Sequence, residues 1–196
     1  MFYFSLLMPP PLLALLSPHF DSKTIELALL FIACFFAWNI LNLIVMYMPL
    51  PDSHLPRADM LDLRNRIVSI VHGAFSLFLS AYSICFDHSQ CGEPNTPFEE
   101  QLMLFTCSYF LYDLLAMAWL GLLDSGMLLH HFICVSAFST CIFTGLSAND
   151  VVGTLFVTEV SNPAMHLRTI LRHMGMRYTK LYEASEFTYM GKESFE

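Results

Sequence analysis

The sequence predicts an all-α protein built as a multi-pass transmembrane helical bundle. Of its 196 residues, 56% are hydrophobic and 13% are charged, and the mean hydropathy of +0.55 is far above that of an ordinary soluble domain. Five apolar stretches are each about long enough to cross a hydrocarbon core as a helix. The formal net charge of −8 provides no basic stripe to neutralise phosphates, so no nucleic-acid partner is expected.

The first expected span covers residues 24–48 and stops at a Pro-containing sequence, Met48-Pro49-Leu50-Pro51. The next spans are expected at residues 67–86, 101–120, 128–145 and 151–171. Residues 1–23 form an apolar lead-in interrupted by Pro9, Pro10 and Pro11, and two interpretations stay open, an interfacial or re-entrant segment and a kinked extra span. Residues 24–190 then form one membrane domain, and residues 191–196 form a short polar tail.

Basic residues orient this bundle. One cluster follows the first span and another ends the fifth, namely Arg57, Arg64 and Arg66, and Arg168, Arg172, Arg177 and Lys180. With five spans both clusters fall on the same side, which the positive-inside rule assigns to the cytosol, although Lys23 argues against this scheme. The loop at residues 87–100 is then lumenal, where a disulfide between Cys85 and Cys91 is one possibility.

The fifth span carries the most unusual polar residues. In a helix, Glu159, Asn162 and His166 fall at steps of three and four and share one face. Pro163 removes the backbone hydrogen bond to the carbonyl of residue 159, so we expect a broken helix here. A carboxylate near the bilayer centre costs a few kcal/mol, so this face is expected to point into the bundle as part of a polar core.

The second and third spans also contain polar groups. In the second, a stripe at helical spacing consists of Ser69, His72, Ser76, Ser80 and Ser83. The serines are expected to serve close helix packing, whereas His72 is a candidate functional residue. Asp113, in the middle of the third span, has two open interpretations: a neutral acid bonded to a tyrosine or a neighbouring histidine, or a proton-transfer group.

The fourth span begins with the adjacent pair His130 and His131. Neighbouring side chains on a helix point about 100° apart, so the two rings cannot hold one metal ion from one face. A non-haem di-iron hydroxylase would need several histidine clusters such as HxxHH, and here the first position of that pattern is Met127. We therefore expect no metal site and no cofactor.

Four motifs together carry a family resemblance: RxRxVSxxHG in the second span, YxxYD in the third, LLHH in the fourth and ExSNPxMHLRxxLR in the fifth. Over about residues 24–190 the chain resembles the TLC domain, which is found in ceramide synthases and related proteins. The resemblance implies a helical bundle with a lipid-accessible cavity, in the endoplasmic reticulum or alternatively the Golgi or plasma membrane. It also implies six or seven spans, so we expect a C-terminally truncated form. Arg66 and Arg168, which the motifs contain, join the candidate polar core.

The function implied by the resemblance is lipid homeostasis, through binding or sensing an acyl or sphingoid lipid; membrane lipids are the expected partners. His130 and His131 match the histidine pair that ceramide synthases use, but the Asp pair of those enzymes has no match here. An N-acyltransferase using acyl-CoA is thus the alternative, with His131 or His130 as general base and Glu159 orienting it. A structural or chaperone-like membrane subunit is the third hypothesis.

Overall fold

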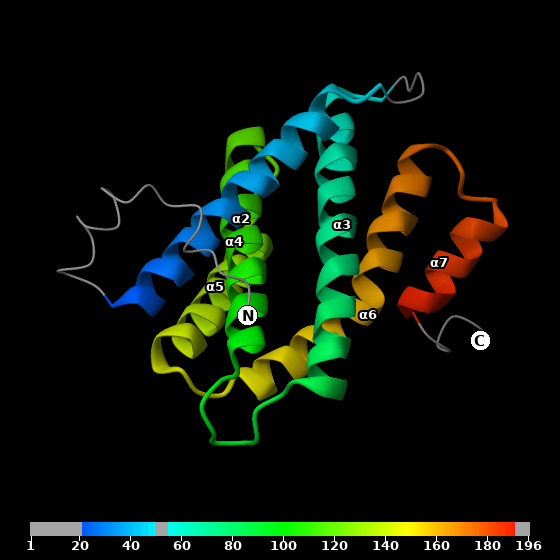
Figure 1. The fold of residues 1–196 in the computed structure, drawn as a ribbon. Helices are drawn as coiled ribbons and strands as arrows, with labels where there is room; N and C mark the ends of the chain where they lie inside the picture. Colours follow the sequence, from blue (N-terminus) through cyan, green and yellow to red (C-terminus); the bar gives the residue numbers. More distant parts are fainter. Residues whose placement is uncertain (1–20, 50–54, 191–196) are drawn as a thin grey trace.

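The computed structural model describes residues 21–49 and 55–190, which form six helices (Figure 1). Their bounds are α2 Ser22–Tyr47, α3 Arg57–Phe86, α4 Pro97–Leu120, α5 Ser125–Thr144, α6 Ala148–His173 and α7 Lys180–Met190. Four of them, α2 to α5, are long and apolar enough to cross a membrane. The predicted multi-pass helical bundle is therefore confirmed, while the predictions for residues 1–20 and 191–196 lie outside the described residues.

Several helix ends are fixed by local sequence. The carboxylate of Asp21 accepts a hydrogen bond from the Thr24 backbone N–H at the start of α2. Thr96 and Glu99 form a reciprocal capping box at the start of α4, with Pro97 in the first turn. Gly121 ends α4 with a left-handed backbone that a glycine adopts without strain. These signals explain why α2, α4 and α5 begin and end within four residues of their expected limits, whereas α3 begins at Arg57, ten residues before the expected start at residue 67.

The core lies around α4, whose buried side chains touch the helices on every side of it. α2 and α5 pack against α4, while α3 makes its most extensive contact with α6 (Figure 1). The central buried apolar side chains include Trp38, Val68, Met103, Tyr109, Phe138 and Val152. The bundle thus consists of two neighbouring groups of helices, α2–α4–α5 and α3–α6, and α3 joins them through its contacts with both α2 and α4.

The polarity of α3 is inverted relative to a helix in a water-soluble protein. Ser76, Ser80 and Ser83 are completely buried, whereas Phe75 and Phe78 are more than half exposed. The buried hydroxyls bond within the protein; Ser80, for example, donates to the Ser76 carbonyl at 2.6 Å. An apolar exterior around polar contacts is the arrangement expected in lipid, and the burial of the serine face is consistent with its predicted role in close helix packing.

α6 bends at Pro163 but does not break. The helix continues from Ala148 to His173, and Figure 1 shows its yellow first half and orange second half running in different directions. The expected break is therefore wrong: loss of one backbone hydrogen bond kinks this helix without ending it. α6 is also absent from the four helices apolar enough to span, because its polar residues lower its hydropathy.

Gly73 allows α3 to approach this bend closely. A Cβ atom on Gly73 would lie 2.8 Å from Glu159 Oε2 and 3.4 Å from Pro163 Cγ. The Glu159 contact is shorter than van der Waals packing allows and the Pro163 contact is at its lower limit, so a side chain at residue 73 would displace the buried Glu159 carboxylate. The small residue in α3 and the proline in α6 thus fit each other.

The end of the bundle that carries the loop at residues 87–96 is held by hydrogen bonds. The buried Glu99 carboxylate accepts bonds from the backbone and hydroxyl of Ser89 and from the Thr96 backbone N–H. The Asn95 side chain donates to the Cys141 carbonyl and accepts from the Ala148 N–H, which ties the α5–α6 corner to this loop. The two cysteines considered for a disulfide, Cys85 and Cys91, are both free and exposed.

At the opposite end the two basic clusters meet. Arg66 of α3 lies 3.4 Å from His166 of α6, and Asp62 lies 3.3 Å from His173. Arg168 pairs with Glu186 of α7 at 3.1 Å and stacks over the Tyr182 ring. The expectation that both clusters share one side is confirmed, and α7, with 11 residues, is too short to cross a membrane.

Candidate functional site

A buried hydrogen-bonded triplet joins three helices. Asp113 of α4 lies between His131 of α5 and Asn65 of α3: one carboxylate oxygen is 2.9 Å from His131 Nε2, and the other accepts a bond from Asn65 Nδ2 at 2.9 Å. All three side chains are at most 6% exposed. Of the two partners considered for Asp113, the histidine is the one present, and the buried Tyr112 hydroxyl has no partner among the described residues.

The hydrogen bonds of His131 use both of its ring nitrogens. Nδ1 faces the Met127 carbonyl at 2.8 Å, and Nε2 faces the Asp113 carboxylate at 2.9 Å. Both partners are acceptors, so the pair holds either an imidazolium beside a carboxylate or a neutral ring beside a protonated acid. In either state His131 has no free nitrogen for a substrate, which is the pattern of a group that joins helices.

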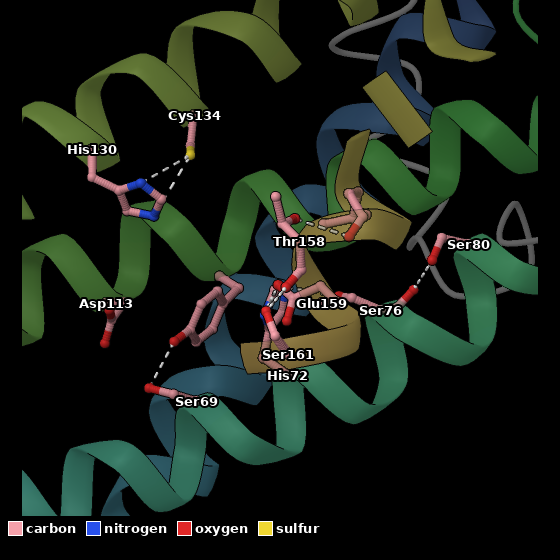
Figure 2. A network of polar contacts seen from close by, with 12 residues as sticks. Ser69, His72, Ser76, Ser80, Asp113, His130, Cys134, Thr158, Glu159 and Ser161 are labelled. Atoms are coloured by element: carbon pink, nitrogen blue, oxygen red, sulfur yellow. Dashed lines mark hydrogen bonds and ion pairs between the residues drawn. The ribbon is translucent and has the colours of Figure 1, made fainter. Parts of the chain in front are cut away.

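A second buried centre lies on the α3–α6 interface (Figure 2). His72 Nδ1 is 3.8 Å from Glu159 Oε1, and its Nε2 is 2.9 Å from the Ser76 hydroxyl. The Tyr109 ring stacks on the His72 ring with centroids 3.7 Å apart and planes 8° apart. His72 is therefore enclosed by polar contacts at its edge and by an aromatic ring on its face.

The two centres are linked through Ser69. The Tyr109 hydroxyl donates to Ser69 Oγ at 3.0 Å (Figure 2). Ser69 donates in turn to the Asn65 carbonyl at 3.2 Å. Asn65 is also the partner of Asp113, so a chain of contacts connects His131 with His72. Side-chain networks of this kind rigidify a buried core when their members are satisfied.

The expected pairing of Glu159 with His131 is wrong, because Asp113 takes that place and Glu159 lies beside His72 instead. The kink at Pro163 and the close approach at Gly73 bring the Glu159 side chain toward α3. Asn162 and His166, on the same side of α6, are partly buried, and the contact of His166 with Arg66 places it against α3 as well.

The adjacent histidines separate as their helical spacing predicts. His131 is 1% exposed, whereas His130 is exposed, and their ring planes stand 88° apart. The Cys134 thiol lies 3.8 Å from Nε2 and 3.9 Å from Nδ1 of His130, and this weak contact leaves the ring nitrogens available (Figure 2). Within the described residues, no group of three or more His, Cys, Asp or Glu side chains is arranged to hold a metal ion.

A cavity of about 690 Å³ lies between α2, α4 and α5. Its walls are mainly apolar, and its polar lining includes an ion pair between Lys23 and Glu100, 2.7 Å apart, and the Ser139 hydroxyl. Sequence reasoning missed Glu100 and Ser139 as site residues. Lys23 was noted only as an exception to the positive-inside rule. The sequence feature that could have indicated the site is the presence of opposite charges, Lys23 and Glu100, at the starts of two apolar helices.

An apolar exterior, buried polar groups within the core, and four helices long and apolar enough to cross a membrane indicate a multi-pass membrane protein. A family model of the TLC domain matches residues 62–190, and the chain belongs to the TLC domain family. Membership indicates a membrane protein of lipid metabolism or lipid sensing. No solved structure matches the chain.

Proposed function

We propose that this protein acts in lipid homeostasis, in the endoplasmic reticulum or alternatively the Golgi or plasma membrane, by binding the hydrocarbon chain of an acyl or sphingoid lipid inside the bundle. The observation that carries the proposal is the cavity between α2, α4 and α5. Its volume of about 690 Å³ lies within the range of small-molecule sites, roughly 300 to 1,000 Å³.

The length of the cavity suits one lipid chain. On α4 its lining runs from Glu100 to Leu111, which corresponds to about 16 Å of helix. This is about half of the ~30 Å hydrocarbon core, the depth of one leaflet. Apolar lining from Leu27, Phe31 and Val135 supports a hydrocarbon chain as the occupant.

The polar network favours binding over catalysis. His131 and Asp113 satisfy each other, and His72 is covered by Tyr109 and bonded to Ser76. Buried groups whose hydrogen bonds are all made within the protein join helices rather than bind a substrate. The cavity is therefore the better candidate for a ligand site.

A photoactivatable palmitoyl lipid tests the proposal on the purified chain in nanodiscs. We expect crosslinks to peptides from α4 and α5, and loss of labelling in Ser139→Phe, whose ring fills the cavity. Ser136→Phe on an exposed face of α5 is the matched control and retains labelling. Equal labelling of both variants, or an unchanged lipid profile in cells lacking the gene, would contradict the proposal.

An N-acyltransferase is the second candidate, and the open ring nitrogens of His130 favour it over a purely structural role. The amine nitrogen would attack the thioester carbonyl of acyl-CoA while His130 takes the amine proton, and the CoA thiolate would then leave. Purified protein would then form labelled amide from acyl-CoA and a long-chain amine, and His130→Ala would abolish it. No product above a denatured control across several amines rules this candidate out.

A further inference from the structure

The ion pair at the rim of the cavity joins two side chains with very different environments. The Lys23 side chain is 63% exposed, whereas the Glu100 side chain is 6% exposed, and Lys23 Nζ donates to Glu100 Oε1 at 2.7 Å. Lys23 comes from the first turn of α2 and Glu100 from the first turn of α4, so both lie at the same end of the cavity. A head group of a lipid whose chain fills the cavity would meet this pair.

The two charged residues that line the cavity, Lys23 and Glu100, have a combined charge of zero, which restricts the charge of the head group. An anionic head group that engages Lys23 would leave the buried Glu100 carboxylate uncompensated, and an unpaired buried charge is strongly unfavourable. A cationic head group would have to displace Lys23 or lie next to it, leaving an excess positive charge. An uncharged head group leaves the ion pair intact.

Glu100 also has unused capacity as a hydrogen-bond acceptor. An ionised carboxylate offers about four lone-pair sites, and among the described residues its side chain accepts the one bond from Lys23. The hydroxyls of Thr24 and Ser139 line the same cavity. Donors on a ligand such as hydroxyl or amide N–H groups would therefore find acceptors at the rim.

We propose that the Lys23–Glu100 pair selects single-chain lipids with an uncharged, hydrogen-bond-donating head group, of the monoacylglycerol type, over lipids of equal chain length with a charged head group. The proposal rests on the proposed function, since it names the ligand class of the same cavity. The ion pair forms hydrogen bonds with the uncharged head group at the cavity mouth, and the apolar walls contact the hydrocarbon chain.

Three probes of equal chain length test this selectivity on the full chain in detergent: 1-monopalmitoylglycerol, palmitate and hexadecylamine. Each displaces a fluorescent long-chain probe at a mildly alkaline pH, where palmitate is ionised and hexadecylamine is protonated. We expect the wild type to bind monopalmitoylglycerol at least about tenfold more tightly than either charged lipid, the effect of one uncompensated charge at a partly buried site.

Two charge variants should change the order of affinity for the three probes, each in favour of a different charged lipid. Glu100→Gln leaves Lys23 as an unpaired cation, so palmitate should become the tightest ligand. Lys23→Gln leaves the carboxylate unpaired, so hexadecylamine should become the tightest. Glu26→Gln, on the exposed face of α2 outside the cavity, is the matched control and should keep the wild-type order.

The outcomes separate the two proposals. Equal binding of all three probes by the wild type, or an unchanged order in the charge variants, overturns the head-group selectivity and leaves lipid binding in place. Failure of every probe to bind the wild type, or undiminished binding in Ser139→Phe, overturns the proposed function itself. The two charge variants test the order independently, one from each member of the ion pair, so a folded protein from either of them is enough to decide the head-group selectivity.

Discussion

The α3–α6 interface and the α2–α4–α5 cavity are built on opposite principles. The interface is rich in polar groups and closely packed, with Gly73 meeting Pro163 and His72 enclosed by Tyr109, Ser76 and Glu159. The cavity has few polar groups and holds open space. The difference teaches that polar residues are dense in this chain where two helices are closely joined, whereas open volume lies where polar residues are few.

The largest expected effect comes from removing the central carboxylate of the polar network. Asp113→Ala leaves His131 and Asn65 buried without their shared partner, so we expect a loss of about 3–5 kcal/mol in the free energy of unfolding. Denaturation in detergent followed by circular dichroism measures this loss. A variant as stable as the wild type would show that the network does not join the helices.

The next effect concerns the close approach of α3 and α6. Gly73→Ala places a methyl group against Glu159 and Pro163, and we expect a cost of about 1–3 kcal/mol. Gly153→Ala is the matched control, since nothing lies within 4 Å of a Cβ at this position in α6, and it should be neutral or stabilising. Equal effects of the two substitutions would contradict tight packing at Gly73.

A larger side chain in the cavity should raise the free energy of unfolding, whereas a larger side chain at residue 73 should lower it. Ser139→Leu places apolar atoms in open space, so we expect a gain of about 0.5–2 kcal/mol together with loss of stabilisation by added lipid. Thermal unfolding with and without monopalmitoylglycerol measures both quantities. Destabilisation comparable to that of Gly73→Ala would show that the cavity is packed in solution, and the contrast between the two regions would then fail.

The smallest expected effect is at the start of α2, next to the cavity rim. Hydrogen bonds from Thr24 lower the pKa of Asp21, so its contribution to stability is present above the unfolded pKa of about 3.9 and is lost as the pH falls through the lower folded value. Asparagine caps a helix about as well as ionised aspartate but does not titrate, so Asp21→Asn should keep the stability near pH 7 and flatten the acidic limb of the profile. An identical acidic limb in both proteins would contradict a role for Asp21.

Much of the fold was predictable because helix length, hydropathy and capping are local properties. The spans at α2 to α5 and the shared side of the two basic clusters followed from residue order alone. The divergence of His130 and His131 followed from helical geometry. The partner of His131 was not predictable: Asp113 and Glu159 both lie on other helices, and which carboxylate reaches the ring depends on how those helices pack.

The sequence by itself determined that this chain is a helical membrane protein of the TLC family, because hydrophobic spans and spaced motifs are read directly from the order of residues. Only the tertiary structure decided that Pro163 bends α6 without breaking it, that His131 is saturated by Asp113 and Met127, and that a cavity opens beside Lys23 and Glu100. The physical reason is that cavities and side-chain partners arise from contacts between helices, which depend on the positions of residues far apart in the chain.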